Sequence, residues 1–232
     1  MELTEEELVK IYPRLWHMAH DGAWPAIQDH GLMSAGALLD AYGVTGEERS
    51  RLFRKRRPES VPLIRSGLPG AVLRDQKPMS DARLERCLRD GFTPAAWYEL
   101  LNSRSFFWLS RDRIWRLLGA SAYRNKAQTV LTVDTYGIVS AHRDRIWLSP
   151  INSGSALFNA RPRGRDTFAR ISDFPFKSRA TTRRSPENVV ELLVEHSVPD
   201  VRDHVLAVHR VRDREILEEV WRSPRAGRDD HP

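Results

Sequence analysis

Apolar residues recur at helical spacing over much of the first half of the chain, whereas short apolar runs dominate the second half. Thr4 stands before three glutamates, which predicts a capped helix at the N-terminus. Proline at the start and glycine at the end mark a helix at 24–30. Gly91 closes a helix at 81–90, and the Thr93 N-cap with Pro94 in the first turn marks another helix at 93–101. Residues 35–57 form another helical region, and the proline-rich segment 58–79 is a loop with room for short strands.

Strands are predicted mainly in the second half of the chain, after a first strand at 14–19. An aromatic strand at 105–110 precedes a helix at 111–118, and further strands are expected at 128–134, 145–148, 188–195 and 204–211, with a loop at 149–155. This order predicts an α+β fold with a mixed, mainly antiparallel sheet and with helices concentrated in the N-terminal half. We expect one domain over residues 1–222, followed by a disordered tail at 223–232 that is rich in Asp, Arg, Gly and Pro.

Composition excludes a membrane protein. The 232 residues suffice for one large domain, 29% of them are charged, and the mean hydropathy is -0.51. Residues 1–10 are acidic and lack the layout of a signal peptide, so we expect a cytoplasmic protein without a membrane partner. The single cysteine, Cys87, cannot form an internal disulfide; it is either a small buried apolar residue or a thiol nucleophile.

The chain has a net charge of +6, and all but five of its 37 basic residues are arginine. They concentrate at 49–65 and 161–184, which indicates a surface for a polyanion such as DNA or RNA, because guanidinium groups match phosphates bidentately. The alternative is a genome whose base composition favours arginine codons. The residues that we expect to contact nucleic acid are Arg54, Lys55, Arg56, Arg57, Arg161, Arg163 and Arg165.

The common signatures of cofactor and hydrolase sites are absent: no dinucleotide-binding glycine pattern, no phosphate-binding loop, no nucleophile elbow and no zinc-protease helix. His17 and His20 stand three positions apart, but no further ligand completes a metal site, so we expect none. Asp134 and Glu191 leave open a nuclease built on paired carboxylates.

Glu191 interrupts the apolar run Val189-Val190-Glu191-Leu192-Leu193-Val194. A carboxylate inside a buried strand is costly unless it is paired or has a function. Glu191 is therefore either a working carboxylate, or a residue that faces solvent at an edge strand or pairs with an arginine.

In three places the chain resembles the ADP-ribosyltransferase superfamily, in particular the DarT-like enzymes. Residues 15–20 and 27–32 resemble that family's opening strand, whose histidine or arginine holds NAD, and the helix that follows it. Residues 107–111 are similar to its second strand, and residues 190–194 to its glutamate-bearing strand. The resemblance implies a split sheet, NAD as substrate, and roles for His17 and Glu191.

The chain also departs from the family pattern. The segment 33–104 is longer than expected, and the functional arginine is either Arg111 or Arg113. Val189 stands where arginine-modifying members carry the first glutamate or glutamine of a pair, which disfavours a protein arginine as acceptor.

The chemistry of the resemblance assigns the remaining roles. Glu191 would stabilise the oxocarbenium-like ribose in the transition state, and His17 would hold a ribose hydroxyl. Trp108 or Tyr123 would stack on the nicotinamide, Arg111 would bind the pyrophosphate or orient the acceptor, and Ser110 and Asn152 would add polar contacts. The sequence thus predicts an NAD-dependent ADP-ribosyltransferase that acts on a nucleic acid; the alternative is a non-catalytic nucleic-acid-binding protein on the same fold.

Overall fold

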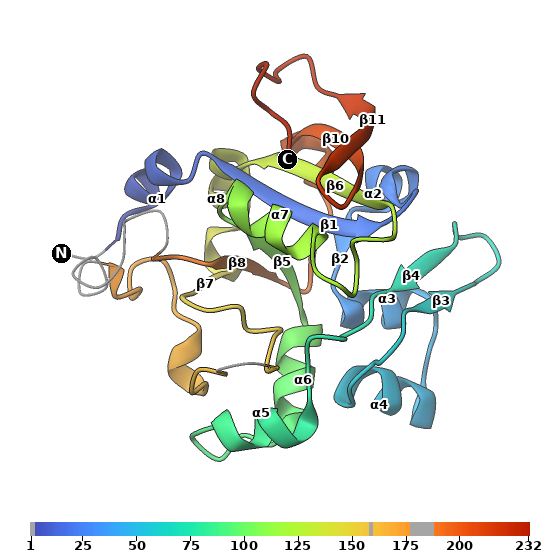
Figure 1. The fold of residues 1–232 in the computed structure, drawn as a ribbon, viewed down its shortest axis with the longest axis vertical. Coiled ribbons are helices and arrows are strands. Elements are labelled where there is room, and N and C mark those ends of the chain that lie inside the picture. Colours follow the sequence, from blue (N-terminus) through green and yellow to red (C-terminus); the bar gives the residue numbers. More distant parts are fainter. Residues whose placement is uncertain (1–2, 158–159, 177–187) are drawn as a thin grey trace.

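A seven-stranded sheet forms the centre of the molecule (Figure 1). The computed structural model describes residues 3–157, 160–176 and 188–232. The strands lie in the order β11-β10-β6-β1-β5-β8-β7, and each neighbouring pair is antiparallel, which confirms the predicted α+β domain and its mainly antiparallel sheet. The strands are β1 (Arg14–His20), β5 (Arg104–Trp108), β6 (Gln128–Asp134), β7 (Ile146–Ser149), β8 (Glu191–Glu195), β10 (Val205–Arg212) and β11 (Glu215–Arg222).

Helices lie mostly in the first half of the chain, as predicted. The structure also has two small two-stranded sheets. One pairs β2 (Leu32–Met33) with β9 (Ser197–Val198), and the other pairs β3 (Val61–Leu63) with β4 (Ala71–Leu73). The helices in the described residues are α1 (Glu5–Ile11), α2 (Trp24–His30), α3 (Ala35–Ala41), α4 (Gly46–Arg54), α5 (Asp81–Cys87), α6 (Pro94–Asn102), α7 (Arg111–Leu118), α8 (Thr135–His142) and α10 (Val201–His204).

Local signals set most of these boundaries. Thr4 and Glu7 form the capping box of α1, and Thr93 and Ser110 cap α6 and α7 by accepting a hydrogen bond from a backbone N–H three positions on. The region expected to be helical over 35–57 splits in two because Gly43 adopts a φ of 69°, a left-handed conformation that ends α3. Sequence analysis missed α8, whose cap is the last residue of β6.

β1 and β5 touch at one point only. Trp16 is paired with Trp108, whereas on its other side β1 is paired with β6 over all seven of its residues. The two strands diverge from this pair, and the sheet opens between them. Trp108 is also paired with Glu191 of β8, so Trp16, Trp108 and Glu191 stand in line across three strands and share one face.

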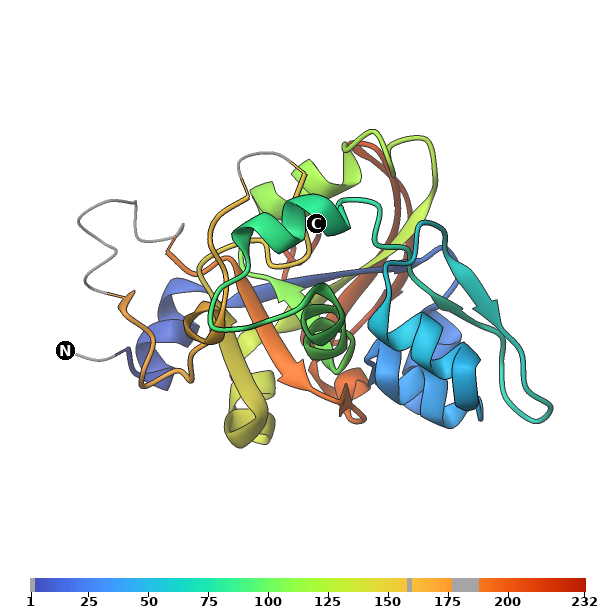
Figure 2. The ribbon, with the colours of Figure 1, turned by 90° about the horizontal axis from the view of Figure 1, so that it is seen from below.

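The segment 33–104 forms a lobe beside the sheet (Figure 2). The β3–β4 hairpin packs on α3 and α4 through its own small core, which is formed by Leu39, Leu52, Leu63 and Leu73. A second core under α5 and α6 contains Trp97 and Tyr98. The additional length of this segment therefore builds helices and a hairpin around one end of the central sheet.

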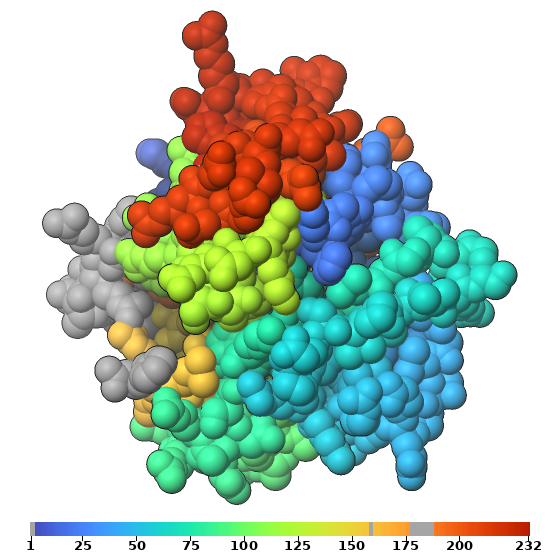
Figure 3. Space-filling view, turned by 45° about the vertical axis from the view of Figure 1, so that its right-hand side comes forward, coloured from blue at the N-terminus to red at the C-terminus, as the bar shows by residue number. Residues whose placement is uncertain are grey.

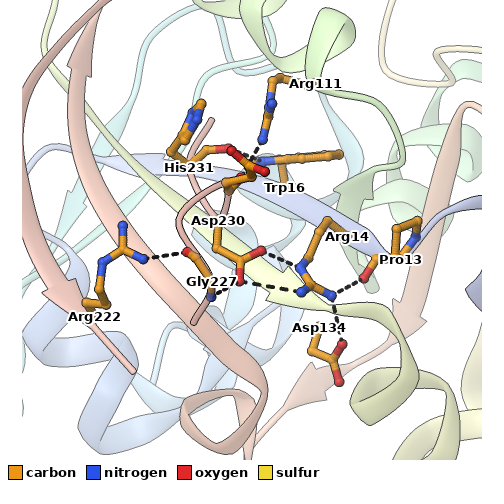
Figure 4. A network of polar contacts seen from close by, with 10 residues as sticks. Pro13, Arg14, Trp16, Arg111, Asp134, Arg222, Gly227, Asp230 and His231 are labelled. Carbon is orange, nitrogen blue, oxygen red and sulfur yellow. Dashed lines mark hydrogen bonds and ion pairs between the residues drawn. The ribbon is translucent and has the colours of Figure 1, made fainter. Parts of the chain in front are cut away.

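The C-terminal residues differ from the expectation of disorder. β11 extends the sheet, and the segment after it folds back over β1 (Figure 4). Asp230 is 4% exposed and accepts a hydrogen bond from Arg14, and the Trp16 indole donates to the backbone oxygen of His231 at 3.3 Å. Composition suggested a loose tail, but the ion pair between the buried Asp230 carboxylate and the partly buried Arg14 anchors it.

Candidate functional site

The opening between β1 and β5 leads to a cavity of about 430 Å³. Its walls come from these two strands, from α2 and α3, from the β4 end of the hairpin and from the loop that follows β7. Among the residues expected to hold or transform NAD, those that line this cavity are His17, Trp108, Tyr123, Asn152 and Glu191. Residues predicted from distant parts of the sequence therefore meet at one site.

Glu191 opens β8 and is 3% exposed. Its carboxylate accepts hydrogen bonds from Ser153, whose backbone N–H lies 3.1 Å from Oε2 and whose hydroxyl oxygen lies 2.7 Å from the same atom. Both donors belong to the loop that follows β7. Burial raises the pKa of Glu191 to about 7, and the Ser153 hydrogen bonds and the Arg163 and Arg113 charges oppose that rise only in part.

A second layer of contacts holds Ser153 itself. Arg163, which is 2% exposed, donates to the backbone oxygens of Ser153 at 2.9 Å and Ser155 at 3.0 Å. The Trp97 indole donates to the same Ser153 oxygen at 3.3 Å. The prediction that Arg163 contacts nucleic acid is therefore wrong, because its guanidinium is used inside the protein to fix the loop that holds Glu191.

His17 lies on β1 at the point where the strands diverge. Its Nδ1 is 2.7 Å from the backbone oxygen of Phe106. A carbonyl oxygen can only accept, so Nδ1 carries the hydrogen and Nε2 is left as an acceptor. Burial lowers the pKa of His17 to about 4, with the Phe106 hydrogen bond acting against the fall and the Arg74 charge adding to it. His17 is thus a neutral hydrogen-bond acceptor in the cavity wall at neutral pH.

Tyr123 and Arg74 form another part of the wall. The Tyr123 hydroxyl donates to Asp75 at 3.0 Å, and the Arg74 guanidinium lies over the Tyr123 ring at 5.4 Å from its centre. Burial lowers the pKa of Arg74, against the Tyr123 and Asp75 contacts that raise it. Sequence reasoning missed Arg74, although its place directly after the apolar run Ala71-Val72-Leu73 marks it as the first charge beyond a short strand.

Arg111 and Ser110 do not line the cavity. Ser110 caps α7 by accepting from the Arg113 backbone N–H at 3.3 Å. Arg111 donates to the backbone oxygen of Asp229 at 2.6 Å and lies over the Trp16 ring (Figure 4). Arg111 therefore holds the C-terminal segment instead of lining the cavity. Of the two arginines, Arg113 is the one whose charge lowers the pKa of Glu191 against the effect of burial.

The first basic cluster is largely used within the protein. Arg57 is 5% exposed and donates to the Arg74 backbone oxygen at 3.0 Å and to Asn102 at 2.9 Å, so the expected contact between Arg57 and nucleic acid is also wrong. Arg54 forms an ion pair with Glu99 at 3.4 Å, and Arg56 donates to the Lys77 backbone oxygen at 3.4 Å. Among the residues predicted to bind nucleic acid, Lys55, Arg161 and Arg165 are exposed and form no ion pair with another described residue.

A group of His142, Asp200 and His204 lies apart from the cavity, with one ligand atom of each within 4.8 Å of the others. Arg145 lies 2.6 Å from Nδ1 of His142, and because a guanidinium can only donate, that nitrogen accepts. The hydrogen of the neutral ring is then on Nε2, which points at Asp200 at 2.7 Å. The group is a hydrogen-bonded chain in which His142 offers no lone pair to a metal.

No helix in the described part of the chain has the length and apolar character to cross a membrane.

The cavity and its lining strands fall inside a region shared with other proteins. The model of a family of unknown function, DUF7002, matches residues 13–205, which run from β1 through Glu191 to the start of β10. A search among curated proteins finds no match. Since the matched region covers most of the chain and all of the cavity, this protein belongs to the DUF7002 family.

Proposed function

We propose that the protein transfers ADP-ribose from NAD to an acceptor, with Glu191 as the central residue. The observation that carries the proposal is the position of this carboxylate in the wall of a cavity that His17 also lines. The carboxylate is buried and hydrogen-bonded to Ser153, and burial raises its pKa to about 7. A cavity of about 430 Å³ has the size of sites that bury an organic ligand.

The reaction breaks the bond between nicotinamide and ribose, and its electron pair leaves with the nicotinamide. The ribose then carries oxocarbenium character until the acceptor forms a bond to the same carbon and loses a proton. A carboxylate in a water-poor cavity stabilises that developing charge, because electrostatic interactions are strong where water is excluded. Since its pKa is about 7, Glu191 is also matched to accept the acceptor's proton near neutral pH.

The other cavity residues supply the binding contacts. The free Nε2 of His17 accepts a hydrogen bond from a ribose hydroxyl, and Trp108, next to Glu191 in register, offers a ring on which nicotinamide stacks. Arg74 takes the role that sequence reasoning gave to Arg111, because it is the cavity arginine close enough to act on His17. Its guanidinium suits the pyrophosphate.

We propose a nucleic acid as the acceptor. The support is the excess of basic residues, part of which stays exposed at Lys55, Arg161 and Arg165, together with the net charge of +6. Val189 two positions before Glu191 disfavours a protein arginine.

The test is incubation of the protein with labelled NAD and with separate pools of DNA, RNA and protein. Wild type is expected to release nicotinamide and to label a nucleic acid, and Glu191→Gln to do neither. The matched control is Glu195→Gln, which changes a glutamate at the other end of β8 and outside the cavity. Binding of nucleic acid without any consumption of NAD would replace the enzyme with a non-catalytic binding protein.

A further inference from the structure

Two segments far apart in the sequence run side by side at the end of α5. The backbone N–H of Arg163 donates to the Cys87 oxygen at 2.9 Å, and that of Arg89 donates to the Arg163 oxygen at 2.9 Å. Next to them the Arg165 N–H donates to the Asp90 carboxylate at 2.8 Å. These bonds bring the end of α5 beside residues 161–165, and Figure 3 shows the green surface of α5 adjoining the yellow surface that follows β7.

Four arginines lie on the two paired segments: Arg86 and Arg89 at the end of α5, and Arg161 and Arg165 on the other segment. All four are exposed, and none forms an ion pair with another described residue. This distinguishes them from the cluster at 49–65, most of whose arginines are paired or buried. We call these four residues the arginine surface.

Acidic residues on the same segments offset only part of this charge. Glu85, Asp90 and Asp166 are exposed there, and Asp90 already accepts the Arg165 backbone N–H. Like charges that are held together without partners repel one another, so the arrangement favours a multivalent anion that contacts several guanidinium groups at once.

The arginine surface is joined directly to the Glu191 site. Arg163, which lies between Arg161 and Arg165 in the chain, points inward and holds Ser153 through its backbone oxygen at 2.9 Å. Ser153 in turn holds Glu191. The neighbours of Ser153, Asn152 and Gly154, line the cavity. The segment 161–165 therefore has exposed arginines at both ends, and the buried Arg163 between them supports the loop that holds Glu191.

We propose that the arginine surface binds the phosphate backbone of a single-stranded nucleic acid and guides it to the cavity. Phosphates at regular intervals satisfy several guanidinium groups together, and a base can reach the cavity only when it is outside a duplex stack. The role of that strand as acceptor rests on the proposed function, whereas its binding does not.

The test is fluorescence anisotropy with labelled single-stranded DNA and RNA between about 50 and 200 mM salt. It compares wild type with R86Q/R89Q/R161Q/R165Q. The matched control is R143Q/R202Q/R212Q/R214Q, which removes the same number of exposed charges from the ends of α8 and β10, from α10 and from the β10–β11 turn. The first variant is expected to bind more than tenfold more weakly. The slope of log affinity against log salt is expected to fall by about 0.7 for each phosphate that the variant no longer neutralises.

An equal loss of affinity in both variants would overturn the proposal, since only net charge would matter. Wild type that fails to bind either nucleic acid, or that binds polyglutamate equally well, would overturn it too. Hydrolysis of NAD in the absence of nucleic acid, in which water bonds to the ribose carbon, loses a proton and nicotinamide leaves, separates this proposal from the proposed function, because the arginine-surface variant is expected to retain that hydrolysis. Wild type that binds the strands at this surface but never consumes NAD would refute the enzyme and leave the surface in place.

Discussion

Replacement of Glu191 by glutamine tests the buried carboxylate in a way that needs no knowledge of the acceptor. The side chain is 3% exposed, and burial raises its pKa from 4.5 to about 7. The native protein therefore holds this proton more tightly than the unfolded chain does. As a result, the stability that comes from the neutral acid is lost as the pH rises from about 4.5 to about 7.

The rise in pKa corresponds to about 3 kcal/mol of unfolding free energy. Glutamine has nearly the same shape and does not ionise, so Glu191→Gln escapes this cost at pH 8 but gains little at pH 5. The change in stability caused by the substitution is therefore expected to be about 2 to 3 kcal/mol more favourable at pH 8 than at pH 5. For a domain of this size that difference equals roughly 5 to 10 °C in Tm.

Thermal unfolding of both proteins at pH 5 and pH 8 measures this difference. The control Glu195→Gln changes a partly exposed glutamate of the same strand, which pairs with Arg170 at 3.7 Å, and is expected to lower Tm or leave it unchanged. The same shift in Tm at both pH values for Glu191→Gln would refute the argument from burial. Undiminished release of nicotinamide by that variant would remove Glu191 from the proposed reaction.

Three further predictions concern the residues around it. Ser153→Ala removes the 2.7 Å hydrogen bond to Glu191 and is expected to raise the pKa of that carboxyl by about 1. Carbon NMR of labelled glutamate and the acidic limb of the pH–rate profile both measure this shift. Ser153→Thr restores the hydroxyl, and an unchanged pKa of Glu191 in Ser153→Ala would count against the contact. His17→Ala is expected to weaken NAD binding about tenfold in calorimetry. Because the pKa of His17 is about 4 and the pKa of Glu191 is about 7, the NAD affinity of Glu191→Gln, in which only His17 of the two is titratable, is expected to stay constant across about pH 6 to 8. A step in that variant near the ordinary histidine pKa of about 6.5 would contradict the neutral ring. Arg163→Met removes the donor to the Ser155 backbone oxygen and one of the two donors to the buried Ser153 oxygen, and it is expected to cost about 3 kcal/mol in denaturant unfolding. The exposed Arg165→Met is expected to be nearly neutral, and equal costs would contradict these positions.

Local chemistry explains the features that the sequence predicted well. The helix at 24–30 begins with Pro25 in its first turn and ends at Gly31, and the helix at 111–118 begins after the Ser110 cap. These signals act within a few residues, so they are readable without the fold. The apolar run around Glu191 likewise indicated burial, because each of its neighbours is a residue that avoids water.

Boundaries moved where a distant segment competed. The helix predicted over 81–90 ends at Cys87, because Leu88 turns to extended backbone and pairs with Arg163. The strand predicted over 188–195 begins at Glu191, where the backbone pairs with β5 and β7.

Local sequence patterns predicted most of the helices and strands, the α+β class of the domain, and the positions of Glu191 and His17 on strands, although they missed α8 and β11. The hydrogen-bond partners of the polar residues, in contrast, depend on the folded chain. Ser153 reaches Glu191 across 38 positions, Arg57 reaches Asn102 across 45, and Arg111 reaches Asp229 across 118. An arginine has the same side chain whether it binds a phosphate or a backbone oxygen, and only the folded chain brings a specific partner within hydrogen-bonding distance. For this reason the clusters of arginine along the sequence did not show that Arg57 and Arg163 are buried. The pairing of α5 with residues 161–165 places Arg163 inside the protein and leaves Arg161 and Arg165 exposed.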